Sequence, residues 1–256
     1  MKTGFGIAGI GGRMGQLVAE EVRAAGGTVV GGIDREGRSV EGERMFASMA
    51  ELAAACAVVI EFAAASAVAG HAAAMAQAGG TAWVLGTTGL SPADEAAVAA
   101  AAEHCPVVCA PNFSPGVNLV LALAERMAAA LPAEQYDAEI LEMHHRQKVD
   151  APSGTALGIG RAVARGRGVR LEDVRTPARE GVTGARKTGE IGFAALRGGQ
   201  VVGEHTLLFA AANEHISLTH RAFDRRAFAA GAVRAAQWVR GKANGLYSMQ
   251  DVLGMH

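Results

Sequence analysis

Short apolar runs alternate with helical stretches over the first 110 residues of the chain. The apolar runs occupy residues 3–9, 29–33, 57–62, 81–85 and 107–110. Apolar residues at helical spacing follow the first run, from Arg13 to Ala25, and Ala-rich stretches accompany the later runs. Strands that alternate with helices usually pair in parallel and are joined by right-handed crossovers. This half of the chain is therefore predicted to be α/β.

The pattern changes after Pro115, where a second domain is predicted to begin. A helix is expected over 117–131, a strand over 136–143 and a helix over 154–164. Residues 165–189 are rich in Arg, Gly and Thr without periodicity and are expected to form a long loop.

Three strand-like runs follow, at 190–196, 200–210 and 214–221. The glycines of RGGQ, residues 197–200, predict a hairpin between the first two runs. Asp224 is the expected N-cap of a helix over 226–240.

Composition narrows the class of partner. The 256 residues are 50% apolar and only 5% aromatic, and they suit one domain plus a smaller second one. The net charge is −1, with acidic and basic residues interspersed. Nucleic-acid and membrane-surface binders need a stronger basic footprint, so a small-molecule partner is expected. Neither a secretion signal nor a membrane span is expected, because every apolar stretch is interrupted by polar residues or glycine.

The cysteines favour a reducing compartment. Cys56, Cys105 and Cys109 make an odd number in a chain large enough to fold without disulfides, so reduced thiols in the cytoplasm are predicted. His104 lies next to Cys105, but no second ligand pair follows, and no metal site is predicted.

The first motif is GIGGRMG, from Gly9 to Gly15, between a predicted strand and a predicted helix. Glycines there let the backbone turn sharply and let a pyrophosphate approach the N–H groups at the helix N-terminus. The spacing is not a strict GxGxxG, so an ordinary structural turn is the alternative. Asp34 stands about 20 residues further on, where an acidic residue binds the adenosine ribose and favours NADH. Arg35 could instead pair with the 2′-phosphate of NADPH.

The second motif is the stretch from Glu142 to Ala156, EMHHRQKVDAPSGTA. This row of charged residues would be costly to bury without partners and is expected to line a cleft for anionic groups. Ser153, Gly154 and Thr155 open a helix, where hydroxyl and N–H groups suit a carboxylate or phosphate. The alternative is a solvated polar loop followed by an ordinary N-cap.

Taken together, these motifs resemble those of the dihydrodipicolinate (4-hydroxy-tetrahydrodipicolinate) reductase family. The resemblance includes GTTG at 86–89, APNFSPGVN at 110–118, IGFAALRGGQVVGEHTLLF at 191–209 and the segment 238–254, so it covers essentially the whole chain. It implies reduction of a cyclic imine dicarboxylate by NADH or NADPH, in the diaminopimelate branch of lysine biosynthesis.

The resemblance also assigns roles to residues. His144 corresponds to the family's acid/base histidine and Lys148 to its proton donor. His145, Gly154 and Thr155 correspond to substrate contacts. The implied cofactor contacts are Gly9, Ile10, Gly11, Gly12, Arg13, Met14, Asp34, Arg35, Gly86, Thr87, Thr88, Ala110, Pro111, Asn112 and Phe113.

In the family the last helix returns to a Rossmann-type dinucleotide-binding domain, here residues 1–114 and 224–256. The resemblance further implies an inserted α+β domain, residues 115–223, that binds substrate and forms a homotetramer. Its closure would carry His144 and Lys148 toward the nicotinamide. One departure lies at Glu61–Ser66, where Ala63 replaces the family's usual hydroxyl residue. The alternatives are an aspartate or homoserine dehydrogenase of the same plan, against which the 144–156 stretch argues, and a dinucleotide sensor without catalysis. A sensor would not need a proton donor such as Lys148.

Overall fold

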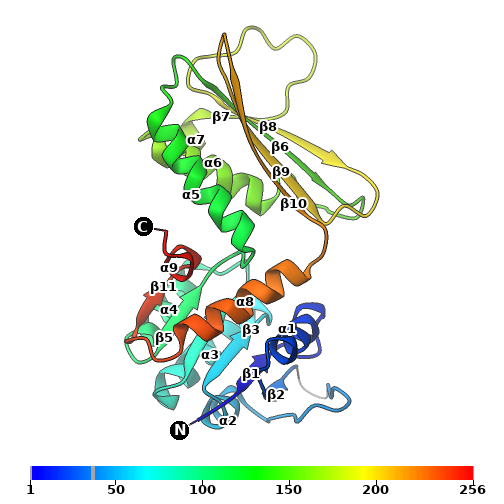
Figure 1. The fold of residues 1–256 in the computed structure, drawn as a ribbon, viewed down its shortest axis with the longest axis vertical. Helices are drawn as coiled ribbons and strands as arrows, with labels where there is room; N and C mark the ends of the chain where they lie inside the picture. Colours follow the sequence, from blue (N-terminus) through cyan, green and yellow to red (C-terminus); the bar gives the residue numbers. More distant parts are fainter. Residues whose placement is uncertain (1, 36–37, 256) are drawn as a thin grey trace. The chain divides into compact units, whose positions relative to one another are not determined.

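The computed structural model describes residues 2–35 and 38–255 (Figure 1). The chain divides into two compact units, one formed by Met1–Pro115 with Arg225–His256 and the other by Gly116–Asp224. Met1 and His256, the ends of the predicted first domain, lie outside the described residues. No helix in the described part of the chain is long and apolar enough to cross a membrane.

The first unit is a parallel sheet in the order β11-β5-β4-β3-β1-β2 (Figure 1). Its strands are β1 Phe5–Ala8, β2 Val29–Ile33, β3 Val58–Glu61, β4 Ala82–Leu85, β5 Pro106–Cys109 and β11 Gly245–Tyr247. Its helices are α1 Arg13–Ala24, α2 Met49–Ala55, α3 Ala65–Ala78, α4 Pro92–Ala102, α8 Arg226–Val239 and α9 Met249–Leu253.

Helices cover both faces of this sheet, which explains why its central strands are buried apolar runs. Val22 of α1 and Val233 of α8 belong to one hydrophobic core. Leu52 of α2 and Met75 of α3 belong to a second core. The predicted α/β class with a Rossmann-type domain is confirmed. After β1 the chain adds β2 on one side of that strand and then β3 on the other side, so the strand order reverses between β1 and β3. Ligands of such parallel sheets bind at the carboxyl ends of the strands that flank this point.

The second unit is a mixed sheet in the order β10-β9-β6-β8-β7. Its strands are β6 Asp137–His144, β7 Arg175–Thr176, β8 Ile191–Arg197, β9 Gly203–Ala210 and β10 His215–Ala222, and its helices are α5 Pro115–Ala130, α6 Gly154–Gly166 and α7 Leu171–Val174. The central strand β6 runs parallel to β8 and antiparallel to β9. Buried and accessible residues alternate along β9, so one face of the sheet is covered and the other is accessible.

The hairpin predicted at RGGQ is wrong. β6 lies between β8 and β9, and the hairpin of this unit joins β9 to β10 instead. The glycine turn signal is local, whereas β6 comes from about 50 residues earlier in the chain and pairs with both strands.

Two further predictions need correction. Helix α8 begins at Arg226 with Arg225, not Asp224, at the N-cap position. The expected long loop after residue 164 is shorter than predicted, because α6 continues to Gly166 and is followed by α7 and β7. The last strand and helix, β11 and α9, were not predicted from the apolar pattern because both are short.

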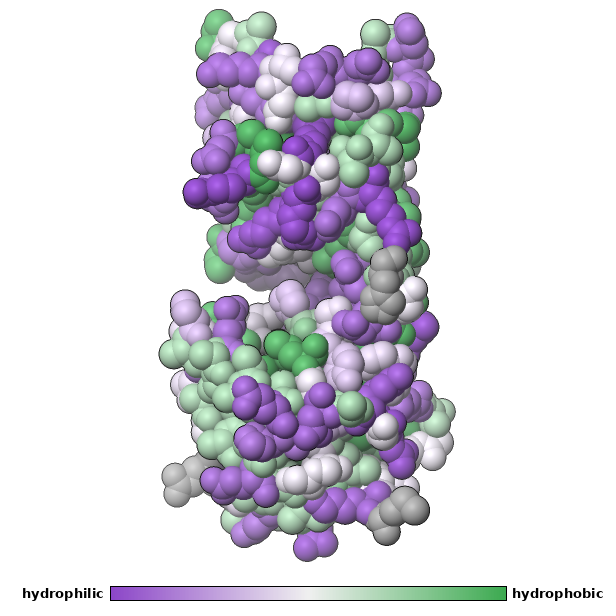
Figure 2. Space-filling view, turned by 90° about the vertical axis from the view of Figure 1, so that its left-hand side faces the viewer, coloured by the Kyte–Doolittle hydropathy of each residue, from purple (hydrophilic) through white to green (hydrophobic). Residues whose placement is uncertain are grey.

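The surface mixes polar and weakly apolar residues. In Figure 2 the pale green surface of the first unit is interrupted by purple hydrophilic groups. All three cysteines are free thiols; Cys56 and Cys105 are buried and Cys109 is half-buried. Burial raises the pKa of each thiol to about 11, so the thiols stay protonated near neutral pH.

Candidate active site

The loop after β1 depends on glycine at two positions. Gly9 has φ +81°, and a Cβ there would lie 2.7 Å from the carbonyl oxygen of Phe62. A Cβ on Gly15 would lie 2.1 Å from the carbonyl oxygen of Gly9. The loop therefore packs directly on its own helix and on the end of β3. Among the described residues no side chain caps the N-terminus of α1, which begins after Gly12. Such a helix N-terminus suits a phosphate.

Asp34 lies beside this loop, at the carboxyl end of β2. Its Oδ2 accepts a hydrogen bond from the Gly11 N–H at 2.7 Å, and its Oδ1 accepts one from the Arg35 N–H at 2.9 Å. The guanidinium of Arg38 donates to the carbonyl oxygen of Gly11. A cavity of about 540 Å³ is lined by Gly12, Asp34, Arg35 and Arg38 together with residues of the β3–α3 segment.

A second cavity, of about 380 Å³, shares part of its lining with the first. Arg13 and Met14 line it from the glycine loop, and Gly86, Thr87 and Thr88 line it from the loop after β4. Gly12, Phe62, Ala63 and Ala64 line both cavities. Ala63, where the sequence departs from the family, therefore lines both cavities, and its carbonyl oxygen accepts a hydrogen bond from the Thr87 hydroxyl at 3.2 Å.

The loop after β5, which contains Ala110–Phe113, has mostly buried or internally hydrogen-bonded side chains. Phe113 is buried and its ring meets that of Phe62 edge to face, with centroids 5.9 Å apart. Ala110 is also buried, whereas Pro111 is exposed. The side chain of Asn112 accepts a hydrogen bond from the Ser114 N–H. Ile10 of the glycine loop is part of the hydrophobic core, so it can meet a ligand only through its backbone.

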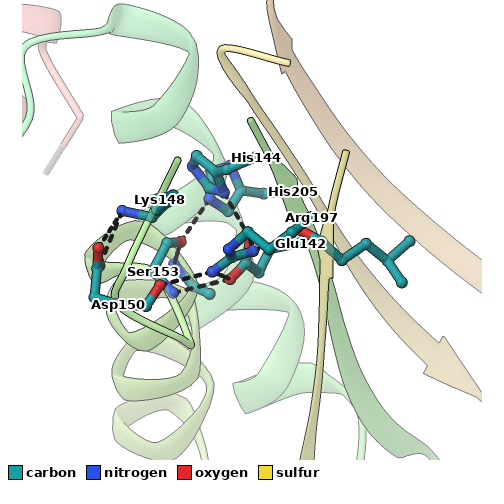
Figure 3. A network of polar contacts seen from close by, with 9 residues as sticks. Glu142, His144, Lys148, Asp150, Ser153, Arg197 and His205 are labelled. Atoms are coloured by element: carbon teal, nitrogen blue, oxygen red, sulfur yellow. Dashed lines mark hydrogen bonds and ion pairs between the residues drawn. The ribbon is translucent and has the colours of Figure 1, made fainter. Parts of the chain in front are cut away.

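A dense polar cluster occupies the second unit, at the end of β6 (Figure 3). Glu142 is 1% exposed, and His144 lies two residues further on the same covered face of the sheet. The Glu142 Oε2 is 2.6 Å from the His144 Nδ1. Burial raises the pKa of Glu142, but hydrogen bonds from Arg197, His144 and the Ser153 N–H outweigh it and lower that pKa. Glu142 is therefore ionised.

The pKa of His144 is lowered. Burial is the largest cause, and the positive charges of Lys148 and Arg197 act in the same direction, while Glu142 opposes them. His144 is therefore mainly neutral near pH 7. Because its Nδ1 faces a carboxylate, the ring presents its Nε2 to its surroundings.

His205 of β9 completes the buried part of the cluster. Its ring meets that of His144 edge to face, with centroids 5.1 Å apart, and its Nε2 is 2.9 Å from the Ser153 Oγ. Burial, followed by the charge of His144, lowers the pKa of His205 to about 4.

Lys148 and the start of α6 form the more accessible part. The Lys148 Nζ donates to both oxygens of Asp150, at 2.8 and 2.9 Å. Ser153 caps α6 by accepting from the Ala156 N–H at 3.1 Å, so Gly154 and Thr155 form the first turn of that helix. The buried Nδ1 of His145 has no hydrogen-bond partner within the described part of the chain.

The structure thus brings the predicted residues together in two groups, one in each unit. Predicted residues of the loops after β1, β2 and β4 line the two cavities, whereas Ala110–Phe113 of the loop after β5 are not among the lining residues. Ile10 and Phe113 have buried side chains. The prediction from sequence missed Arg38, Glu142, Arg197 and His205. Glu142 stands within the second motif, and its spacing of two from His144 on a strand was the available signal. Arg197 and His205 join the cluster only through the register of the sheet, and no local signal marked them or Arg38.

Comparison with known proteins gives matches along nearly the whole chain. Residues 3–113 match the family model described as dihydrodipicolinate reductase, N-terminus, and residues 116–253 match the one described as its C-terminus. A 4-hydroxy-tetrahydrodipicolinate reductase from Granulibacter bethesdensis is 66% identical over 254 residues, covering 98% of this chain and 97% of that protein. Another from Acidiphilium cryptum is 60% identical, with the same two coverages.

Solved structures show the same fold. A dipicolinate-bound dihydrodipicolinate reductase from Paenisporosarcina sp. TG-14 has a TM-score of 0.78 at 24% identity and covers 98% of this chain and 99% of its own. Aspartate dehydrogenase from Thermotoga maritima has a TM-score of 0.55 at 11% identity and covers 94% of this chain and 98% of its own. At these identities the likeness concerns the fold alone.

Proposed function

The chain belongs to the dihydrodipicolinate reductase family, and we propose that the cluster around His144 binds and protonates its substrate. The reaction is the nicotinamide-dependent reduction of 4-hydroxy-tetrahydrodipicolinate, a cyclic dicarboxylate, to tetrahydrodipicolinate in the diaminopimelate pathway of lysine biosynthesis. The observation that carries the proposed site is one cluster of polar contacts, buried at His144 and accessible at Lys148, that includes the N-terminus of α6.

The cofactor is a nicotinamide dinucleotide, and the first unit fits it. Its glycine loop has no room for a Cβ at Gly9 or Gly15, and among the described residues no side chain caps the N-terminus of α1. Two cavities with shared lining residues lie beside this loop. These features suit an extended dinucleotide. We assign the pyrophosphate to Gly9–Met14 and the adenosine ribose to Asp34. Gly86–Thr88 and Ala110–Phe113 are assigned to the nicotinamide half. When bound, the nicotinamide supplies the hydride.

Use of both NADH and NADPH is proposed. Asp34 offers a carboxylate to a ribose diol, and Arg35 and Arg38 line the same cavity and can neutralise a 2′-phosphate. The test is kcat/KM and Kd for both nucleotides in the parent protein and in Arg35→Ala. Selective weakening of NADPH is expected. Equal weakening of both nucleotides, or of neither, would remove Arg35 from this role.

The second unit is proposed to bind the substrate carboxylates. The first-turn N–H groups of Gly154 and Thr155 can donate hydrogen bonds to one carboxylate. The His145 Nδ1, which has no partner among the described residues, can bind the same carboxylate. Lys148 can move from Asp150 to a substrate carboxylate, because that ion pair is on the accessible side of the cluster.

Proton transfer is assigned to His144 and Lys148. Hydride addition to the conjugated ring imine leaves an enamine that must gain a proton. Both side chains can hold a proton at a nitrogen, the His144 Nε2 and the Lys148 Nζ, and both lie in one cluster (Figure 3). Lys148 also offsets the negative charge of the substrate.

The direct test is oxidation of NADH and NADPH followed by absorbance, with the substrate generated in the cuvette by a coupled synthase. Substrate-dependent oxidation is expected with at least one nucleotide. Absence of oxidation with both would overturn the proposal. We also propose that the protein is a homotetramer and works in the cytoplasm, where nucleotide and substrate are dissolved.

A further inference from the structure

We propose that Glu142 and Arg197 act together as positioning residues that hold His144 as the Nδ1–H tautomer, with Nε2 facing the substrate. The proposal rests on the proton-transfer role given to His144 above. It assigns a positioning role to Glu142, which is buried, and to Arg197, which is half-buried, and both act through His144.

The first support is the complete pairing of the Glu142 carboxylate. Arg197 donates one hydrogen bond to each oxygen, both at 2.9 Å. The Ser153 N–H donates to Oε1 at 3.1 Å, and the His144 Nδ1 lies 2.6 Å from Oε2. An ionised carboxylate only accepts hydrogen bonds, so the His144 Nδ1 must carry the hydrogen. The tautomer of a neutral His144 ring is thereby fixed.

The second support is the space beside the other ring nitrogen. A Cβ on Gly203 of β9 would lie 3.1 Å from the His144 Nε2, so glycine at this position leaves that side of the ring uncrowded. His144 is only 8% exposed, so its neighbours hold the ring in place. The ring is therefore bound at Nδ1, and residue 203 places no side chain against Nε2.

The third support is the balance of charge around His144. Glu142 faces it from its own strand, Arg197 from β8 and His205 from β9, while Lys148, paired with Asp150, faces it from the following turn. A buried carboxylate alone would raise the pKa of His144 and keep it charged. Burial is the largest effect that opposes Glu142, and the positive charges of Lys148 and Arg197 add to it, so the pKa of His144 is lowered. Glu142 thus orients the ring, and the charge of Arg197 helps to keep the ring neutral.

The same pair connects His144 to the anion site. Arg197 donates to the carbonyl oxygen of Asp150, and Glu142 accepts from the Ser153 N–H. Both ends of the turn before α6 are therefore fixed relative to the ring that transfers the proton. A change in the pair should alter kcat through His144 and KM through the Gly154–Thr155 turn.

The test is NMR of the full-length protein with isotope-labelled histidine, without ligands, with His144 assigned by loss of its signals in His144→Asn. The expected parent spectrum shows Nδ1–H for neutral His144. Glu142→Gln should lower the titration midpoint of His144, because a negative charge is lost. Arg197→Gln should raise it, because a positive charge is lost, and Arg197→Lys should restore it.

A matched control is Glu204→Gln. Glu204 is paired with Arg221 and stands opposite Met143, whose side chain lies on the other face of the sheet from His144. This variant should leave the midpoint unchanged. A parent Nε2–H tautomer, or shifts of the same sign in the Glu142 and Arg197 variants, would overturn the proposal. The tautomer is measured in the parent protein, so misfolding of the Glu142 or Arg197 variants cannot obscure it.

Kinetics separates this inference from the proposed function. Glu142→Gln and Arg197→Gln should lower kcat by about 10- to 100-fold and shift its pH profile in opposite directions, a partial loss of general acid–base catalysis. The Kd for NADH should stay unchanged, because its proposed site lies in the first unit. If the parent enzyme fails to oxidise NADH and NADPH, the proposed function fails while the tautomer measurement still stands. Unchanged kcat with the expected NMR shifts would remove the catalytic importance of the pair.

Discussion

His144 and His205 are neighbouring histidines whose surroundings suit different roles, proton transfer for His144 and structural stabilisation for His205. His144 has a carboxylate at Nδ1 and an uncrowded edge at Nε2. His205 is 4% exposed, and its Nε2 lies 2.9 Å from the Ser153 Oγ. A ring so enclosed can support Ser153 but has little access to substrate. We therefore expect changes at His144 to affect turnover and changes at His205 to affect stability.

His144→Ala and Lys148→Ala should each lose about 10²- to 10⁴-fold in kcat, the usual contribution of a general acid or base. Binding of NADH should be retained, since neither residue lies in the first unit. The measurements are steady-state kinetics with the coupled substrate and NADH titration by fluorescence. Unchanged turnover in either variant would refute the role of that residue.

The lowered pKa of His205 predicts a pH-dependent stability. The folded protein holds His205 neutral down to about pH 4, whereas the unfolded chain protonates it near 6.5. Its contribution is therefore fully present above pH 6.5 and is lost as the pH falls from 6.5 toward 4. About 2 kcal/mol should be lost between pH 7 and pH 5. Denaturant unfolding at both pH values should show a smaller loss in His205→Gln, and an equal loss would contradict the assignment.

At the scale of elements, the strands and helices with a clear apolar period were predictable, and the pairing of strands was not. The five apolar runs of the first unit could be recognised in the sequence, because strands covered by helices on both faces need apolar residues along most of their length. β11 has three residues and no such run. The RGGQ turn suggested a hairpin because pairing with the distant strand β6 leaves no mark near the turn.

For the candidate active site, too, the residues that are close in sequence could be predicted and those brought together by strand pairing could not. The His144–Thr155 group is contiguous in sequence and was visible there, including its likeness to a family. Arg197 and His205 reach the cluster from strands about 50 and 60 residues away, through the register that sets Arg197 opposite His144 and His205 opposite Glu142. A single sequence does not contain that register in readable form, since it follows from packing of the whole sheet.

The N-cap of α6 joins fold and function in one element. Ser153→Ala removes the cap of the Ala156 N–H and the bond to His205, and it should cost about 1–2 kcal/mol of stability. Loosening the first turn should also raise KM for the dicarboxylate. The control is Ser48→Ala, which removes the cap of α2 in the other unit and should cost about 1 kcal/mol with KM unchanged. Equal effects of both variants on KM would show that the α6 cap has no role in binding.

At the scale of the whole molecule, exposed apolar residues on the accessible face of the second sheet support the proposed homotetramer. Leu141 of β6 and Leu196 of β8 are 44% and 49% exposed on strands whose opposite face is covered by α6. Leu196 stands opposite Met143, so the three apolar side chains share that face. Each leucine that an interface buries completely contributes about 1.5–3 kcal/mol, whereas a lysine there must lose its hydration. This exposed apolar face therefore supports the proposed homotetramer, in which other copies of the chain would cover it.

The double variant Leu141→Lys/Leu196→Lys should consequently reduce the mass measured by light scattering from that of a tetramer to that of a dimer or monomer. Leu246→Lys provides the control, because Leu246 is 52% exposed on β11 of the first unit and the change adds one lysine elsewhere on the surface. It should leave the mass unchanged. A parent protein that is monomeric at micromolar concentration would contradict the tetramer. An unchanged mass in the double variant would place the interface on another surface, because four subunits would otherwise bury eight lysines in apolar contacts.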